Sequence, residues 1–240
     1  MCGRFRVARK KEILEAEFGA DVADDDQDWV PRYNVAPGQE IAVVRQDAAQ
    51  PVRRLSQLRW GLIPSWTNDP SIGYKMINAR SETVATMASF REPFRSQRCL
   101  IPADGFYEWK RAGKEKLPFC FTLLDEAVFA FAGIWDRWKD PQGKWVETCS
   151  ILTTKPNKLV QDIHDRMPVI LARDSYDVWL EPGFCKVPEL QPLLKPYSAE
   201  AMRRYRVSQR VNQVKNDDAE CVAEINPAVS ESRESGPLLY

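Results

Sequence analysis

Cys2, the residue after the initiator methionine, carries two groups that could react together. Methionine is usually removed before a small residue, and its removal here would give Cys2 a free α-amine beside its thiol. An α-amine has a pKa of roughly 7.7–8.0, so part of it is neutral at cytosolic pH and can condense with an aldehyde to an imine. The thiol could then close a five-membered thiazolidine. The position alone equally allows an incidental cysteine at a frayed terminus.

Three further side chains could assist such a reaction. His164, the single histidine, lies in IHDRMPVIL, in a polar turn where it could face a pocket and shuttle protons. Glu108 lies in ADGFYEWK, where shielding by aromatic neighbours would raise its pKa and let it act as acid as well as base. The amide of Asn78, in MINARSET, could orient a substrate hydroxyl or phosphate. Each residue also has an ordinary structural interpretation: a satisfied histidine, a solvent-facing strand carboxylate and a turn asparagine.

Arginine and tryptophan gather in strings that could bind an unpaired nucleic-acid strand. LRWGLIPSW contains Arg59, Trp60 and Trp66, and tryptophan faces stack on bases while arginine holds phosphate. We expect Trp60 to lie in the core and Trp66 in a groove. YKMINAR and REPFRSQR add the cations Lys75, Arg80, Arg91, Arg95 and Arg98. Since no base-reading motif accompanies them, binding would follow backbone and shape.

Composition restricts the possible settings of this chemistry. The 240 residues include 34 Lys plus Arg and 34 Asp plus Glu, so net charge gives no case for a nucleic-acid partner and only local clustering could. Residues 3–20 mix charges with few apolar residues, unlike a signal peptide, and no stretch approaches the roughly 18 apolar residues of a membrane span. We therefore expect a cytoplasmic protein without membrane contact, associated with the nucleoid when it binds DNA.

The cysteines argue for a reducing compartment and against a metal centre. None of the six forms a CxxC pair, and one histidine contributes little to a zinc site. We expect reduced thiols, no metal and no cofactor. The six are Cys2, Cys99, Cys120, Cys149, Cys185 and Cys221.

Strands outnumber helices in the hydrophobic pattern. Runs rich in β-branched and aromatic residues predict strands at 41–45, 54–60, 117–124, 128–135, 149–154 and 168–172, and a further strand should leave the Asp104-Gly105 turn and carry Glu108. Helices are predicted at 10–18, ending at Gly19; at 174–180, capped by Asp174 and Ser175; and at 188–194.

No βαβ alternation, repeat or linker appears in this pattern. We therefore predict an α+β fold with a largely antiparallel, barrel-like sheet and a few short helices. One domain should span residues 1–225, with 226–240 as a flexible tail and the acidic run 24–26 as a solvated loop.

Seven strings, in order along the chain, together resemble the SRAP family of SOS-response-associated peptidases, or abasic-site processing proteins. They are MCGRF (1–5), RYNVAPGQ (32–39), LRWGLIPSW (58–66), INARSET (77–83), RCLIPADGFYEWK (98–110), IHDRMPVIL (163–171) and VNQVKNDDAE (211–220). Each string is weak alone, but seven in order are specific. The resemblance implies a single α+β domain around a barrel-like sheet.

The resemblance also assigns roles to residues. Cys2 matches the covalent nucleophile, Asn78 the asparagine that orients the N-terminus and opened sugar, Glu108 the proton-transfer carboxylate, and His164 the histidine that helps open the deoxyribose. Positions implied to contact DNA are Arg4, Arg80 and Arg166 for phosphate, with Trp66, Thr153 and the loop from Asn34 to Pro37 along the strand. Thr67 stands where some relatives carry a second tryptophan, so one stacking surface is missing.

The implied activity is covalent crosslinking of Cys2 to abasic sites in single-stranded DNA during the DNA damage response. The adduct would be a thiazolidine. The implied accompanying activities are removal of Met1 by the protein itself and weak lyase activity. We expect a monomer. Two alternatives stay open: a thiol peptidase using Cys2, His164 and Glu108, and a non-catalytic single-stranded DNA-binding module.

Overall fold

Five strands close into a ring in the computed structural model, which describes residues 2–22, 29–47 and 52–225. Antiparallel pairings join β5 to β4, β4 to β7, β7 to β10 and β10 to β11, and a parallel pairing of β11 with β5 closes the barrel. The ring consists of β4 (Glu40–Gln46), β5 (Arg53–Trp60), β7 (Arg98–Ala103), β10 (Phe129–Lys139) and β11 (Trp145–Thr154).

Four short strands extend this sheet beyond the ring. β2 (Ala20–Val22) pairs with β5, β6 (Asn78–Arg80) and β12 (Met167–Pro168) pair with β11, and β13 (Ile170–Leu171) pairs with β10. The parallel pairing of β6 with β11 places Asn78 opposite Ile151.

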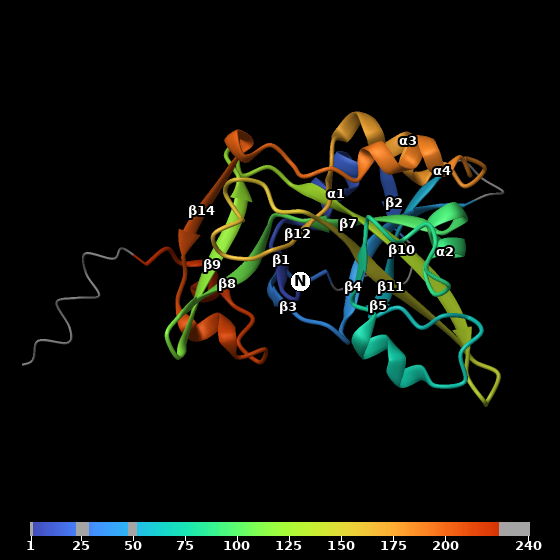
Figure 1. Cartoon of the computed structure of the whole chain (residues 1–240), viewed down its shortest axis with the longest axis horizontal. Helices are drawn as coiled ribbons and strands as arrows, with labels where there is room; N and C mark the ends of the chain where they lie inside the picture. The colour runs from blue at the N-terminus through green and yellow to red at the C-terminus, as the bar shows by residue number, and fades with distance from the viewer. Residues whose placement is uncertain (1, 23–28, 48–51, 226–240) are drawn as a thin grey trace, which may run out of the picture.

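A second, fully antiparallel sheet lies beside the barrel, in the order β14-β9-β8-β1-β3 (Figure 1). β8 and β9 form a long hairpin in it, and β1 joins the start of the chain to β8. Its strands are β1 (Phe5–Val7), β3 (Arg32–Val35), β8 (Gly105–Ala112), β9 (Glu115–Leu123) and β14 (Met202–Arg206).

Aromatic packing joins the two sheets around the first strand. The buried ring of Phe5 meets Trp60 of the barrel at 5.3 Å and Phe131 at 5.7 Å, both edge-on. Phe106, opposite Phe5 in β8, stacks on Phe121 at 5.0 Å. Burying one such ring stabilises the fold by about 1.5–3 kcal/mol. This packing anchors β1 and thereby fixes the residues just before it, including Cys2.

The helices are short and few, as predicted. α1 (Lys11–Phe18) ends at Gly19, whose left-handed φ of 55° suits glycine. The predicted helix at 174–180 is a 3-10 turn, Arg173–Ser175, followed by α3 (Tyr176–Leu180), and its predicted side-chain cap is wrong because the Ser175 hydroxyl bonds Asp174 instead. The remaining helices are α2 (Arg91–Ser96), α4 (Val187–Leu190) and 3-10 turns at Pro70–Lys75, Gln191–Leu193, Ala199–Ala201, Gln209–Asn212 and Ala219–Val222.

The α+β class and the largely antiparallel, barrel-like sheet are confirmed. The predicted strands are present, but the run 168–172 is divided at Val169 between β12 and β13, because the chain passes there from pairing with β11 to pairing with β10. Short strands such as β1, β2 and β6 have too few residues to give a recognisable run and were not predicted. The barrel strand β7 was not predicted either, because its run contains Pro102, a residue that argues against a central strand. The acidic run 24–26 and the tail 226–240 lie outside the described residues.

Candidate functional site

Cys2 lies beside β8 because the first strand pairs with it. Phe5 is opposite Phe106, and the backbone N–H of Tyr107 donates to the carbonyl of Arg4 at 3.0 Å. Continuing this antiparallel register backward from Arg4 carries the chain alongside Glu108. Cys2 is completely buried there and interacts electrostatically with the Glu108 carboxylate. Two residues 106 positions apart are thus neighbours through a single strand pairing.

Burial controls the protonation of Glu108. Its side chain is 4% exposed, and loss of hydration raises its pKa from the ordinary 4.5 to about 8. The carboxyl group is therefore largely protonated at neutral pH and can donate a proton to a reacting oxygen. The predicted shielding of Glu108 agrees with this environment, and the alternative of a solvent-facing strand carboxylate does not.

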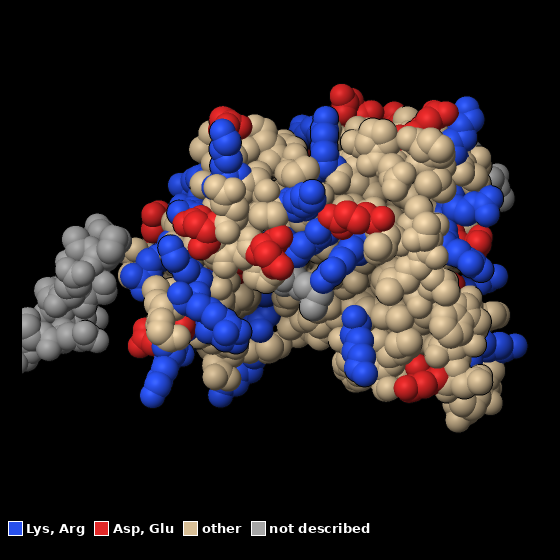
Figure 2. All heavy atoms as spheres, in the orientation of Figure 1, with Lys and Arg blue, Asp and Glu red and all other residues tan. Residues whose placement is uncertain are grey.

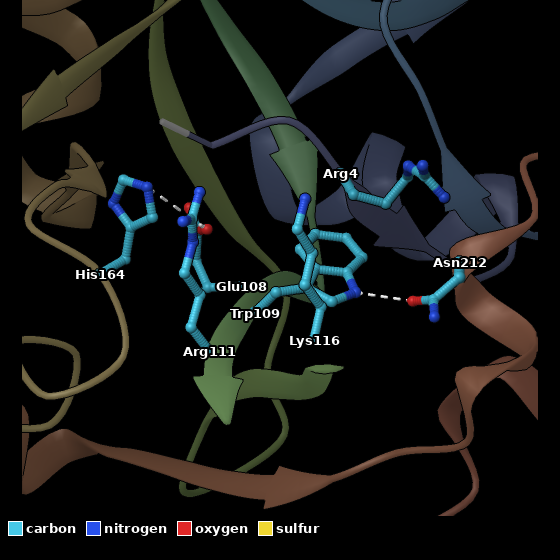
Figure 3. Close-up of a pocket in the computed structure, with 7 residues that line it drawn as sticks. All are labelled: Arg4, Glu108, Trp109, Arg111, Lys116, His164 and Asn212. Carbon is cyan, nitrogen blue, oxygen red and sulfur yellow. Dashed lines mark hydrogen bonds and ion pairs between the residues drawn. The ribbon is translucent and has the colours of Figure 1, made fainter. Parts of the chain in front are cut away.

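His164 faces Glu108 from the segment that follows β11. Its Nε2 lies 4.0 Å from Oε2 of Glu108. Figure 3 marks this contact with a dashed line. The backbone N–H of Arg166 donates to Nδ1 at 3.0 Å, and burial lowers the pKa of the imidazole below its ordinary value. The ring is therefore neutral near pH 7, with its proton on Nε2, directed at the carboxyl group. The Asp165 carboxylate, 2.9 Å from Nδ1, would accept a hydrogen bond from that nitrogen if the ring were charged.

The Cys2 thiol is not poised as a thiolate. Burial, followed by the neighbouring charge of Glu108, raises its pKa well above the ordinary range. A thiol that acts as the first nucleophile in a peptidase normally has a lowered pKa. The environment of Cys2 therefore suits a neutral thiol that reacts after another step. All six cysteines are free thiols.

A pocket of about 520 Å³ opens beside Glu108 and His164. Its lining combines these two groups with cations and the face of an indole (Figure 3). Figure 2 shows many lysine and arginine side chains, with acidic side chains among them, on the lobe of β8, β9 and β14 and near the centre of this face. The other lining residues are Arg4, Trp109, Arg111, Lys116 and Asn212.

Arg4 and Asn34 were both predicted to contact DNA. Arg4 lines this pocket, whereas Asn34 does not reach the surface. Arg4 Nη1 donates to Asn34 Oδ1 and to the carbonyl of Val211, each at 2.7 Å, and its guanidinium lies over Trp109. Asn34 is fully buried, and its amide donates to three carbonyls of the segment 211–216. Its side chain therefore positions Arg4 and that segment, while its predicted contact with DNA stays a prediction.

Two other predicted DNA contacts have protein partners. Arg166 forms a bidentate ion pair with Glu82 at 2.6 and 2.8 Å and donates to the carbonyl of Thr153 at 2.6 Å. Thr153 is only 1% exposed and its carbonyl supports Arg166; its predicted contact with DNA stays a prediction. Glu82 neutralises Arg166, and its own pKa is lowered to about 2 chiefly by this hydrogen bond.

Asn78 is held at the barrel edge by its amide nitrogen, while its amide oxygen is left without a partner in the described part of the chain. Its Nδ2 donates to the carbonyl of Ile77 at 3.0 Å and of Ile151 at 3.4 Å. Its Oδ1 is buried without a hydrogen-bond partner among the described residues. Since buried polar atoms are nearly always paired, this oxygen is a candidate acceptor for a substrate group. Its role in orienting a sugar stays a prediction.

The remaining predicted contacts agree with an accessible surface. Trp66 is 61% exposed and Arg80 is exposed, while Pro37 is half-buried in the loop after β3. Trp60 is fully buried, as predicted. Whether the exposed residues touch DNA stays a prediction.

Sequence reasoning missed several residues of the pocket. Trp109 donates its indole N–H to Asn212 Oδ1 at 2.7 Å, which ties the β8–β9 hairpin to the segment 209–212. Arg111 and Lys116 project from the same hairpin (Figure 3). The run KRAGKEK at 110–116, with four cations around a glycine turn, was the available signal for the two cations.

Glu108 makes the stability of the fold depend on pH. Because its folded pKa, about 8, lies above the ordinary 4.5, its stabilising contribution is complete below pH 4.5 and is lost as pH rises toward 8. Glu108→Gln has no such titration. We expect the difference in unfolding free energy between variant and wild type to shift in favour of the variant by about 3 kcal/mol from pH 4.5 to 7. Urea unfolding across this range measures it, and a constant difference would contradict the burial argument.

The fold and site define a class: an α+β protein with a closed five-strand barrel and a buried cysteine, at the start of the chain, beside a carboxyl group and an imidazole. The model of the family "SOS response associated peptidase (SRAP)" matches residues 1–214. The chain therefore belongs to the SRAP family, as its seven strings predicted.

Individual relatives agree with this assignment. Abasic site processing protein YoqW of Bacillus subtilis is 47% identical over 223 residues, covering 92% of this chain and 99% of its own. Abasic site processing protein HMCES of Xenopus tropicalis is 32% identical and covers 90% and 72%. A protein of Bacteroides thetaiotaomicron with a crystal structure superposes with a TM-score of 0.83 at 31% identity, covering 93% of this chain and 100% of that one.

The described residues contain neither a candidate metal-binding cluster nor a membrane-spanning helix. Residues 2–22, 29–47 and 52–225 contain no group of three His, Cys, Asp or Glu side chains that could hold a metal ion. Within the same ranges, no helix has the length and apolar character to cross a membrane.

Proposed function

We propose that this protein processes abasic sites by trapping their ring-opened aldehyde in single-stranded DNA through Cys2, after removal of Met1. The observation that carries the proposal is the burial of Cys2 beside Glu108, with His164 4.0 Å from that carboxyl group. Glu108 and His164 both line a pocket that cations also line. The names of the relatives YoqW and HMCES support abasic sites as the substrate class.

The reaction balances without a cofactor. His164 and Glu108 assist opening of the deoxyribose hemiacetal to its aldehyde. The neutral Cys2 amine attacks C1′, and loss of water, aided by a proton from Glu108, gives the imine. The Cys2 sulfur then bonds to C1′ while its proton passes to the nitrogen, which closes the thiazolidine. This order suits the raised pKa of the thiol, because the amine reacts first.

Two minor activities are part of the proposal. The site removes its own Met1 by hydrolysis of the bond before Cys2, which releases the amine. An imine that is not captured by the thiol acidifies the C2′ proton, and β-elimination then breaks the strand on the 3′ side, which is weak lyase activity. General thiol peptidase activity toward other proteins is less favoured, because the Cys2 thiol lacks the lowered pKa of such nucleophiles.

Intact mass tests the proposal. The purified protein is measured alone and after incubation with a short single-stranded oligonucleotide carrying one abasic site. Loss of Met1 and a denaturation-stable mass equal to protein plus oligonucleotide minus water would support it, provided undamaged DNA gives none. Retained Met1, or a Met1-free protein that forms no stable adduct, would overturn it in favour of a peptidase or a non-covalent binding module. Gel filtration of the same sample tests the expected monomer.

A further inference from the structure

Arg111 and Lys116 form a pair of like charges that the fold does not neutralise. They are directly opposite each other in the β8–β9 hairpin, and both are exposed. In the part of the chain that the structure describes, neither side chain forms an ion pair or a hydrogen bond. Like charges at opposed positions destabilise a strand pair. Two cations opposed in this way do not contribute to the stability of the fold.

Neighbouring cations are treated differently. Lys110, one residue before Arg111, lies 3.7 Å from the Asp162 carboxylate. Arg204 pairs with the same aspartate, Arg166 with Glu82, and Arg210 with Asp218. Arg4, the other cation in the pocket, bonds only to neutral oxygens of Asn34 and Val211. Acidic side chains therefore neutralise the cations that surround the pocket, whereas the cations that line the pocket keep their positive charge.

The two hairpin cations border the pocket that contains the candidate chemistry. Arg111 and Lys116 line it together with Glu108 and His164, and Figure 3 shows both side chains extending along Glu108 and Trp109 rather than away from them. The pocket thus places two unneutralised cations beside the acid–base pair. An anionic group attached to the reacting sugar would reach these cations.

We propose that Arg111 and Lys116 form a phosphate subsite that holds a backbone phosphate adjoining the abasic sugar. The identity of that sugar rests on the function proposed above, whereas phosphate binding by the hairpin does not. Arginine matches two phosphate oxygens with its fork of N–H donors, and lysine adds a point charge. The pair acts in binding and positioning, so its loss raises the DNA concentration needed for half-maximal rate and leaves the saturated rate nearly unchanged.

The double variant Arg111→Gln/Lys116→Gln tests the subsite in the full-length protein. On undamaged single-stranded DNA we expect Kd to rise roughly ten-fold or more, and the slope of log K against log salt to fall in magnitude by about 0.7, the value for one phosphate. Tm should rise by roughly 1–3 °C, because the opposed charges are gone. A variant that is more stable yet binds more weakly excludes misfolding as the cause. The matched control Lys139→Gln/Lys144→Gln removes two cations from the β10–β11 hairpin and should leave Kd within about two-fold.

Neutral phosphate analogues locate the contact. Oligonucleotides with one methylphosphonate, placed in turn on each side of the abasic site, should weaken wild-type binding at one adjoining position. The double variant should show no further loss at that position. Equal losses in wild type and variant at every position, or an unchanged salt slope, would overturn the subsite even if adducts form. Failure of adduct formation with an intact methylphosphonate effect would instead count against the trapping chemistry alone.

Discussion

Cys2→Ala is expected to reduce the denaturation-stable adduct by more than roughly 1,000-fold, because the ring-closing sulfur is absent while the α-amine stays. Alanine is also a small residue, so Met1 should still be removed by cellular aminopeptidase action. The remaining amine can form an imine that borohydride reduces to a stable product. We therefore expect a reducible adduct and increased strand cleavage where wild type gives a stable crosslink and little cleavage.

Denaturing gels with and without borohydride measure both products on one abasic oligonucleotide. Cys185→Ala is the matched control, since Cys185 is the exposed free thiol and lies outside the pocket. It should crosslink like wild type. A stable adduct of undiminished yield in Cys2→Ala would eliminate the thiazolidine, and loss of crosslinking in Cys185→Ala would move the nucleophile to that residue.

Glu108→Gln is expected to slow adduct formation by about 10²–10⁴-fold, the usual effect of losing a positioned acid or base. In wild type, the carboxyl group must be protonated to donate to the departing water, so the rate should fall as pH rises through about 8. The amine must be neutral, so the rate should fall as pH drops below its own pKa. The wild-type profile is therefore bell-shaped, and the variant should lose the fall at high pH.

Single-turnover rates between pH 5.5 and 9.5 provide the comparison, with Glu115→Gln as the control for an exposed carboxylate on the same hairpin. The control should keep the wild-type profile. If Glu108→Gln retains both the rate and the high-pH fall, Glu108 takes no part in proton transfer. The same variant is expected to gain stability relative to wild type as pH rises. Chemistry that stays slow as this relative stability increases would separate function from folding.

The sequence predicted the parts of the molecule that local patterns encode. Runs of β-branched and aromatic residues marked four of the five barrel strands, and Gly19 marked the end of the first helix, because strand propensity and backbone preference act over a few residues. The reactive potential of Cys2 followed from its position alone. Membership of the SRAP family was visible in strings of five to thirteen residues.

Tertiary structure decided protonation, charge and accessibility. The pKa of Glu108 depends on burial by residues that β1 and the segment around His164 bring to it, which no local pattern records. Arg166 resembled a free phosphate ligand until the fold placed Glu82, 84 positions away, against it. Asn34 resembled a loop contact and proved to be buried. The charge state of a group is set by its neighbours in space. The sequence therefore named candidate reactive residues, but only the fold determined which of them are neutral, paired or accessible to a substrate.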